Sequence, residues 1–187
     1  MREDEDLTDL IRAAAGGERK AFEDLVLKKR ERVVRTAFQI TGNLEDAKDV
    51  AQGVFLRLWK VLRRFDLTKR FDTWLYRITV NAAIDFVRER GPKGFLQAMP
   101  EGAAETLQDP ARPADELYDL GQLQGLFLRL AAKLAPKQRA AFVLKEIEGL
   151  DTAEVARILD VTESTVRNHL LQARRILREA MSREYPS

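Results

Sequence analysis

The stretch DTAEVARILDVTESTVRNHLLQARRIL, residues 151–177, decides the fold of this chain. Its apolar residues recur at helical spacing and predict a short helix, a tight turn at Asp160–Thr162 and a longer second helix. Asp151 and Thr162 are residue types that commonly cap helix N-termini, and Glu154 stands where a capping box places its carboxylate. Two helices joined by so short a turn are typical of a helix-turn-helix.

The longer helix has two unlike faces. Its core face is expected to hold Val166, Leu170, Ala173 and Leu177. The opposite face carries polar and basic residues around one leucine: Ser164, Thr165, Arg167, Asn168, Leu171, Gln172, Arg174, Arg175 and Arg178. Arginine, asparagine and glutamine can read guanine or adenine edges, and arginines also bind phosphates. A solvated polar face is the alternative, but the leucine among these side chains favours binding to a DNA duplex.

The segment that starts at Leu44 is predicted to be an amphipathic helix. Its core stripe is Ala47, Val50, Val54, Leu58 and Leu62, which leaves an outer face of Asp49, Gln52, Leu56 and Lys60. An exposed leucine among polar residues fits a modest protein interface, with a solvated helix face as the alternative. Gly53 interrupts this helix, where glycine costs about 0.5–1 kcal/mol relative to alanine. It either permits close approach of a partner or is simply tolerated.

The next helix, RFDTWLYRITVNAAIDFVRER at residues 70–90, also has two faces. Its core stripe is expected to be Leu75, Ile78, Ala82 and Phe86. A separate face holds Trp74, Arg77, Asn81, Asp85 and Arg88. Aromatic rings beside basic residues are typical of single-strand nucleic-acid binding, although Trp74 is as well suited to the core, and Tyr76 is expected to be structural.

Charge and helix-breaking residues divide the chain into two domains. Residues 1–90 carry 19 Lys+Arg and 16 Asp+Glu, residues 91–121 carry 2 and 6, and residues 122–187 carry 11 and 8. The acidic middle is rich in proline and glycine, which break helices. No strand pattern is present. The sequence therefore predicts an all-α chain, with helical domains at 1–90 and 114–187 and a flexible linker at 91–113.

Composition excludes several kinds of site. With no cysteine and one histidine, His169, the chain lacks the residues for disulfides, thiolate metal sites and most histidine chemistry. It contains no GxxxxGK[ST], HExxH or GxGxxG motif. We therefore expect no catalytic residue, metal or other cofactor. No run is long and apolar enough for a membrane span, and the acidic start MREDEDLTDL is no signal peptide, so we expect a cytoplasmic protein.

Three segments, in this order, resemble one known family. They are DAKDVAQGVFLRLWK (residues 46–60), FDTWLYRITVNAAIDFVRER (71–90) and LKEIEGLDTAEVARILDVTESTVRNHLLQARRIL (144–177). Together they are similar to the extracytoplasmic-function (ECF) sigma factors, the small two-domain class of bacterial RNA polymerase sigma subunits. The resemblance covers about residues 18–182. It implies a sigma-2 helical bundle, a sigma-4 helix-turn-helix domain and promoter-specific initiation of transcription.

The resemblance implies a role for the first domain. In this family sigma-2 melts the minus-ten element and captures single-stranded bases. Asn81 matches the position that faces the flipped base, and the loop Phe65–Arg70 matches the specificity loop. The implied minus-ten residues are Phe65, Lys69, Arg70, Trp74, Arg77, Asn81, Asp85 and Arg88. The outer face of residues 46–60 matches the segment that docks on the beta-prime clamp helices, although Gly53 replaces the usual acidic residue.

For the second domain, the resemblance implies binding to the minus-thirty-five duplex and to the beta flap of the polymerase. Arg167, Asn168, Leu171 and Gln172 occupy the reading positions, and Gln172 replaces an arginine that is common there. The family also implies an anti-sigma factor as a partner and a monomer outside complexes. The alternative is a stand-alone helix-turn-helix regulator. The face around Trp74 and Asn81 counts against it, because a protein that binds only duplex DNA needs no single-strand site.

Overall fold

The computed structural model describes residues 2–97 and 125–184 of the chain. Every regular element in these two ranges is helical. The first range contains α1 (Arg2–Ala15), α2 (Arg19–Thr41), α3 (Leu44–Val61), a 3-10 turn η1 (Leu62–Arg64) and α4 (Phe71–Gln97). The second contains helical residues 125–131, α6 (Pro136–Phe142), a π-helical segment (Val143–Ile147), α7 (Thr152–Leu159) and α8 (Glu163–Glu184). The predicted all-α fold with two helical domains is confirmed.

Helix α4 is longer than the sequence predicts. It continues past Gly91 and Pro92 to Gln97, so the first residues of the predicted linker at 91–113 are helical. Helix propagation is cooperative, and the buried part of α4 supports these last turns against the local helix breakers. The remainder of the predicted linker lies outside the described residues.

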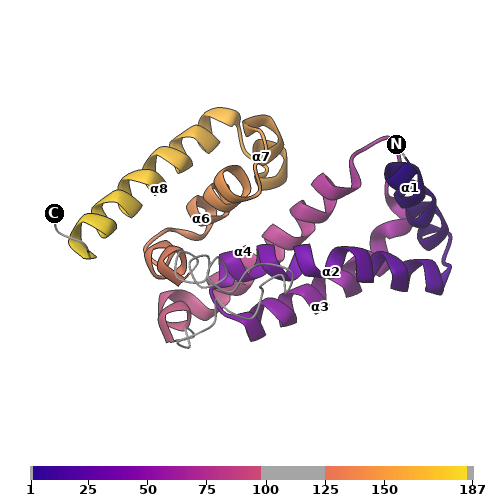
Figure 1. Ribbon diagram of the computed structural model, residues 1–187, viewed down its shortest axis with the longest axis horizontal. Helices are drawn as coiled ribbons and strands as arrows, with labels where there is room; N and C mark the ends of the chain where they lie inside the picture. The colour runs from indigo at the N-terminus through magenta and orange to yellow at the C-terminus, as the bar shows by residue number, and fades with distance from the viewer. Residues whose placement is uncertain (1, 98–124, 185–187) are drawn as a thin grey trace, which may run out of the picture.

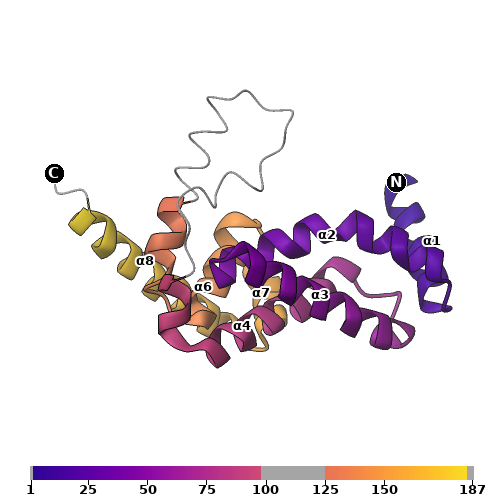
Figure 2. The same cartoon turned by 90° about the horizontal axis from the view of Figure 1, so that it is seen from below.

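The first domain is built around α2, α3 and α4. Figures 1 and 2 show α2 and α3 running side by side along the molecule, with α1 at the far end of α2. The predicted stripe is buried as expected, with Ala47, Val50, Val54 and Leu58 on α3 and Leu62 in η1. Asn43 caps α3 by accepting a hydrogen bond from the backbone N–H of Asp46 at 2.9 Å.

The core face of α4 differs from the prediction. Leu75 and Ile78 are buried, but Ala82 and Phe86 are only half-buried. The residues that are buried deeper are Thr79, Val80, Ala83 and Ile84. The reason is that α4 is covered twice, by α2 and α3 of its own domain and by α6 and α7 of the second domain. A single helical stripe could not satisfy both contacts.

The second domain folds as the sequence predicts. Asp151 caps α7 by accepting from the Glu154 N–H at 2.7 Å, and Thr162 caps α8 by accepting from the Thr165 N–H at 3.1 Å. Asp160 ends α7 with a left-handed φ of 54°, which makes the tight turn. The two domains share one apolar cluster, in which residues of α2 and α4 pack with those of α6 and α7. The domains therefore lie against each other, with α8 reaching away from the first domain (Figure 1).

Two leucines of α2 provide a test of this core. Leu25 has no exposed surface, whereas Leu27, on the same helix, is 59% exposed. Leu25→Ala should lower the free energy of unfolding by about 2–5 kcal/mol because it leaves a cavity. Leu27→Ala is the matched control and should change it by roughly 0.5 kcal/mol or less. Urea unfolding followed by circular dichroism measures both, and equal losses would contradict this packing of α2.

Candidate nucleic-acid interface

Helix α8 presents the predicted duplex-reading face to solvent. The exposed members are Ser164, Arg167, Asn168, Leu171, Arg174, Arg175 and Arg178, while Thr165 and Gln172 are half-buried. Leu171 is 66% exposed. The opposite stripe is buried as predicted: Val166, Leu170, Ala173 and Leu177. Packing of this stripe fixes the rotation of α8 and so aims the polar face outward.

Three arginines of this face have carboxylate neighbours within the second domain. The pairs are Arg174 with Glu146 at 2.6 Å, Arg167 with Glu163 at 3.4 Å and Arg175 with Glu179 at 3.8 Å. Such exposed ion pairs contribute only about 0–1 kcal/mol. The guanidinium groups are therefore easily exchanged onto an anionic ligand.

His169 lies beside this face and adds no charge to it. It is half-buried, and burial, followed by the nearby Lys137, holds its pKa below the ordinary value. The imidazole is therefore neutral at pH 7. Among the residues that the structure describes, no group of histidine and acidic side chains is arranged to hold a metal ion.

The loop that precedes α4 is shaped by its own side chains. The Asp66 carboxylate accepts from the Thr68 hydroxyl at 2.7 Å and from the Thr68 N–H at 3.0 Å. These two hydrogen bonds lower the pKa of Asp66 and make an Asx turn. Lys69 and Arg70 follow the turn and are exposed. The loop thus presents two cations at the start of α4.

Trp74 belongs to an aromatic cluster at the root of this loop. Its ring centroid lies 4.8 Å from that of Phe65, with the planes tilted by 31°, and 6.0 Å from that of Phe71. Phe65 and Phe71 meet edge to face at 5.4 Å. Trp74 is half-buried. The indole therefore packs against the core and still keeps accessible surface. This position is compatible with both roles expected from the sequence, a core residue and an aromatic platform for a base.

Beyond Trp74, the predicted polar face of α4 is present. Asn81 is half-buried, whereas Arg77, Asp85 and Arg88 are exposed. Arg88 lies 4.0 Å from Asp85. A partly sheltered amide among exposed charges is suited to form hydrogen bonds that select one ligand edge.

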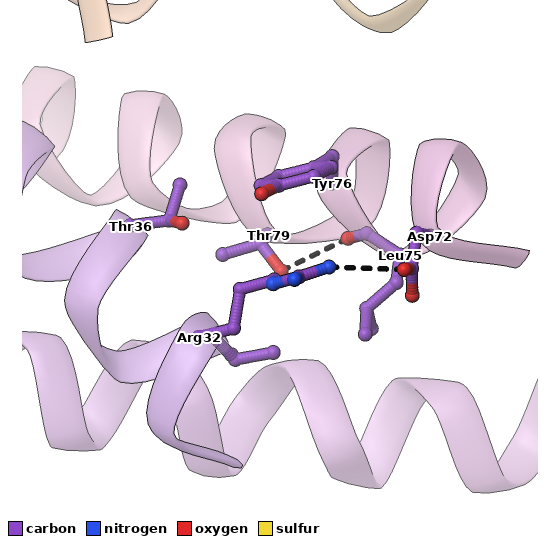
Figure 3. Close-up of a pocket in the computed structure, with 7 residues that line it drawn as sticks. Arg32, Thr36, Asp72, Leu75, Tyr76 and Thr79 are labelled. Carbon is purple, nitrogen blue, oxygen red and sulfur yellow. Dashed lines mark hydrogen bonds and ion pairs between the residues drawn. The ribbon is translucent and has the colours of Figure 1, made fainter. Parts of the chain in front are cut away.

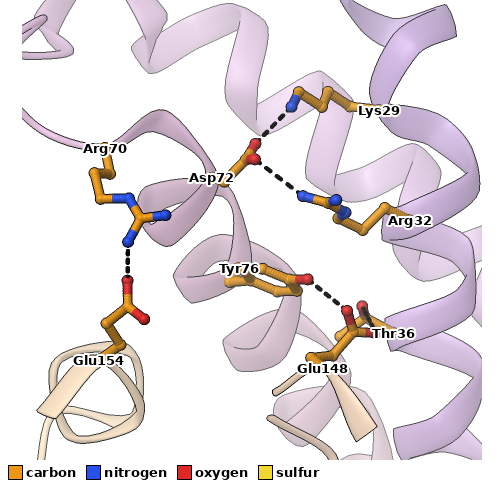
Figure 4. A network of polar contacts seen from close by, with 8 residues as sticks. All are labelled: Lys29, Arg32, Thr36, Arg70, Asp72, Tyr76, Glu148 and Glu154. Carbon is orange, nitrogen blue, oxygen red and sulfur yellow. Dashed lines mark hydrogen bonds and ion pairs between the residues drawn. The ribbon is translucent and has the colours of Figure 1, made fainter. Parts of the chain in front are cut away.

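The start of α4 is tied to α2 by one carboxylate. Asp72 accepts from Lys29 at 2.6 Å and from Arg32 at 2.9 Å (Figure 4). Beside it lies a small cavity, lined by residues that include Arg32, Asp72 and Tyr76 (Figure 3). Its volume is about 10 Å³, which is no more than one water molecule needs. Asp72 therefore positions α4, and the cavity is too small for an organic ligand.

Carboxylates of the second domain contact this same region of the first domain. Arg70 donates to Glu154 at 2.7 Å, and the Tyr76 hydroxyl donates to Glu148 at 2.5 Å (Figure 4). Burial first, and then the hydrogen bond to Glu148, raises the pKa of Tyr76 well above its ordinary value. Tyr76 is thus structural, as predicted. The expected capping-box role of Glu154 is replaced by this contact with Arg70.

A buried arginine makes a further contact between the domains. Arg139 of α6 is 2% exposed and donates to the carbonyl oxygens of Ile40, Ala131 and Leu134. Burial lowers the pKa of Arg139 to about 10, so the guanidinium remains charged at pH 7. Arg139 and Glu148 were not singled out from the sequence, because no local pattern marks a residue that pairs with a distant helix.

The outer face of α3 is open, as predicted. Asp49, Gln52, Leu56 and Lys60 are all exposed, Leu56 by 59%. The sequence reasoning missed Trp59, which is 41% exposed and packs edge to face on Phe22 at 4.7 Å. A Cβ added to Gly53 would meet nothing within 4 Å. The chain's own packing therefore does not require glycine there.

In the described part of the chain, no helix has the length and apolar character needed to cross a membrane.

Both halves of the chain match descriptions of one family. Sigma-70 region 2 matches residues 25–92, and Sigma-70, region 4 matches residues 124–177. The chain is 30% identical over 177 residues to the ECF RNA polymerase sigma factor SigW of Bacillus subtilis (strain 168), a match that covers 91% of this chain and 94% of SigW.

Two solved structures are similar as well. CnrH, solved in complex with the cytosolic domain of CnrY, has a TM-score of 0.68 and 25% identity, covering 95% of this chain and 98% of CnrH. The sigma factor RpoE from Bartonella quintana, solved with the anti-sigma factor NepR, has a TM-score of 0.64 and 20% identity, covering 87% and 98% of the two chains. The second likeness shows the fold alone. Given its two matched regions and a relative that is 30% identical along nearly the whole length, the chain belongs to the ECF sigma factors and directs the initiation of transcription.

Proposed function

We propose that this sigma factor recognises promoters through two faces and makes no catalytic contribution of its own. The exposed face of α8 reads the minus-thirty-five duplex, with Arg167, Asn168, Leu171 and Gln172 toward the bases. The polar face of α4 and the preceding loop capture the melted minus-ten strand. The observation that carries this proposal is the pairing of a solvent-facing Leu171 among base-reading side chains with a sheltered Asn81 beside Trp74.

The outer face of α3 is proposed to dock on the beta-prime clamp helices of core RNA polymerase. Leu56 supplies an apolar centre, and Asp49, Gln52 and Lys60 surround it, which matches the composition of a modest interface. Trp59 lies on the same helix and adds exposed aromatic surface, a residue type enriched in interfaces. The second domain would contact the beta flap.

An anti-sigma factor is proposed as a further partner. Support comes from CnrH, which is 25% identical to this chain and was solved in complex with another protein, the cytosolic domain of CnrY. The stand-alone regulator considered from the sequence is not favoured, because a regulator of that kind has no use for the second, single-strand face on α4.

The direct test of the proposed function is run-off transcription. Core RNA polymerase alone should give no transcript from a promoter of this factor, and addition of the chain should give a transcript of defined start. Fragments of genomic DNA selected by the reconstituted polymerase supply the promoter. Retention of duplex binding without any transcript would instead favour the stand-alone regulator.

Asn81→Ala tests the minus-ten face. Loss of the amide removes both a donor and an acceptor, so discrimination at one minus-ten position should fall by about tenfold, which corresponds to roughly 1.4 kcal/mol. Transcription from promoters that carry each of the four bases at every minus-ten position measures this. Glu89→Ala, an exposed change on the same helix, is the control and should keep the native preference. An unchanged preference in Asn81→Ala at equal polymerase binding would return this face to a structural role.

Arg167→Ala and Arg178→Ala test the division of labour on α8. Arg167 is the proposed base-reading residue, and its loss should cost about 1–3 kcal/mol of binding free energy and relax the preference at one minus-thirty-five base pair. Arg178 is the proposed phosphate-binding residue. Its loss should weaken binding to all promoters alike and reduce the slope of log affinity against log salt concentration by about 1. Binding of the reconstituted polymerase to promoter variants over a range of salt measures both. If the two variants shift sequence preference equally, the assignment is wrong.

A further inference from the structure

The loop that precedes α4 carries one exposed aliphatic side chain, that of Leu67. It is 41% exposed. A single exposed leucine is ordinary on a protein surface, so its exposure alone indicates nothing. Its surroundings set it apart, because the exposed cations Lys69 and Arg70 follow it closely and the aromatic pair of Phe65 and Trp74 lies at the root of the loop. Leu67 therefore lies where the proposed function brings a DNA strand.

Hydrogen bonds hold this part of the loop in one shape. The backbone N–H of Lys69 donates to the carbonyl oxygen of Asp66 at 3.0 Å, which closes a β-turn with Leu67 at its first central position. The Asp66 carboxylate accepts from the N–H of Thr68 at 3.0 Å and from its hydroxyl at 2.7 Å. An ordered turn thus presents Leu67 to solvent. Little conformational entropy remains to be lost when the turn meets a ligand.

The acidic side chain of the loop is occupied within the turn. One carboxylate oxygen of Asp66 holds Thr68, and the other lies 3.8 Å from the ammonium group of Lys69. The Lys69 side chain is 75% exposed, and an exposed ion pair of this kind is weak. Lys69 can therefore exchange this partner for a phosphate. The turn offers a cation for the backbone of a strand and, beside it, an apolar group for a base.

The chemistry of leucine limits what Leu67 can recognise. Its side chain has no donor and no acceptor, so it cannot select a base edge by hydrogen bonds. Among the four DNA bases, only thymine carries a methyl group, on C5. Burial of that methyl group against an aliphatic side chain is favourable. Contact with the flat face of a base would favour no base in particular. The selective contact open to Leu67 is therefore with thymine.

We propose that Leu67 is a specificity-determining residue that contacts the methyl group of a thymine in the melted minus-ten strand. Asp66 is its positioning residue, because its hydrogen bonds shape the turn. This inference rests on the proposed function of the loop and of the α4 face. It adds to that function a particular base and the group on that base which is recognised. Asn81, which selects by hydrogen bonds, and Leu67, which selects by apolar contact, then have separate roles.

The test compares oligothymidylate with oligodeoxyuridylate of the same length, which differ only in the methyl group. Both are labelled with fluorescein, and the chain is titrated alone and after assembly with core RNA polymerase, with core polymerase alone as background. The parent should bind oligothymidylate about fourfold more tightly, the gain expected from burial of one methyl group. Leu67→Ala should lose this preference, and Leu67→Met, which keeps the apolar bulk, should retain most of it. Leu27→Ala, at a leucine of α2 that is 59% exposed, is the matched control and should keep the full preference.

The role of Asp66 is tested by the same ratio of affinities. Asp66→Ala should bring the ratio close to one although Leu67 is still present, because the turn loses its hydrogen bonds. Asp66→Asn keeps an acceptor oxygen for Thr68 and should retain the preference. Both oligonucleotides carry the same charge, so the removal of an acid changes both affinities alike and cancels in the ratio. Lys69→Ala should for the same reason weaken both complexes and leave the ratio unchanged.

Each other outcome counts against the inference. Equal affinity of the parent for the two oligonucleotides, or an unchanged ratio in Leu67→Ala, would overturn the contact with thymine. So would a loss of affinity in Leu67→Ala that is the same for both oligonucleotides, since it would indicate contact with the face of a base. A parent ratio in Asp66→Ala would remove the positioning role. Run-off transcription by the parent without any thymine preference would refute this inference alone, whereas the absence of a transcript would refute the proposed function.

Discussion

The arrangement of this sigma factor depends on a charge buried between its two domains. The guanidinium of Arg139 has almost no exposed surface, and water cannot solvate it there. Its hydrogen bonds go to carbonyl oxygens, two in its own domain and one at Ile40, near the end of α2. The last carbonyls of a helix have no partner within the helix, and a cation is favourable beside them. The charge of α6 and the end of α2 therefore satisfy each other, which fixes how the second domain sits on the first.

Around this contact, the helices bury one face in the core and leave another face exposed for binding. Helices α3 and α8 each bury one continuous stripe and leave the other side in water, so their outer residues can meet large partners without disturbing the core. Helix α4 differs, because it is packed on two sides and exposes a narrower strip. Its polar face therefore lies beside the domain interface.

The sequence predicts the parts of this fold that arise from neighbours along the chain. The stripe of α3, the caps Asp151 and Thr162, and the outward Leu171 all follow from helical periodicity or from local hydrogen bonds, and the structure agrees with each. The sequence does not predict the contacts of Glu148 and Glu154 with α4 and its loop, because they join residues far apart in the chain. The sequence also does not predict the second buried side of α4. The helical periodicity of α4 indicates one buried stripe, and the helices that cover its other side come from a distant part of the chain. The duplex-binding face of α8 follows from helical periodicity and from the chemistry of its side chains, whereas the choice of Arg167, Asn168, Leu171 and Gln172 as its reading positions came from family resemblance.

The shared interface also limits how freely the two domains can be recombined. Glu148 of the second domain contacts Tyr76 and Arg35 of the first domain. This contact forms only when each domain supplies its own residues. A chimera that joined this first domain to a second domain without an acid at that place would bury a hydroxyl group with no acceptor. Promoter specificity can therefore be exchanged by swapping whole domains only with sigma factors that keep both the first-domain residues and the second-domain acid of this contact. Gradual change on the outer face of α8 meets no such restriction.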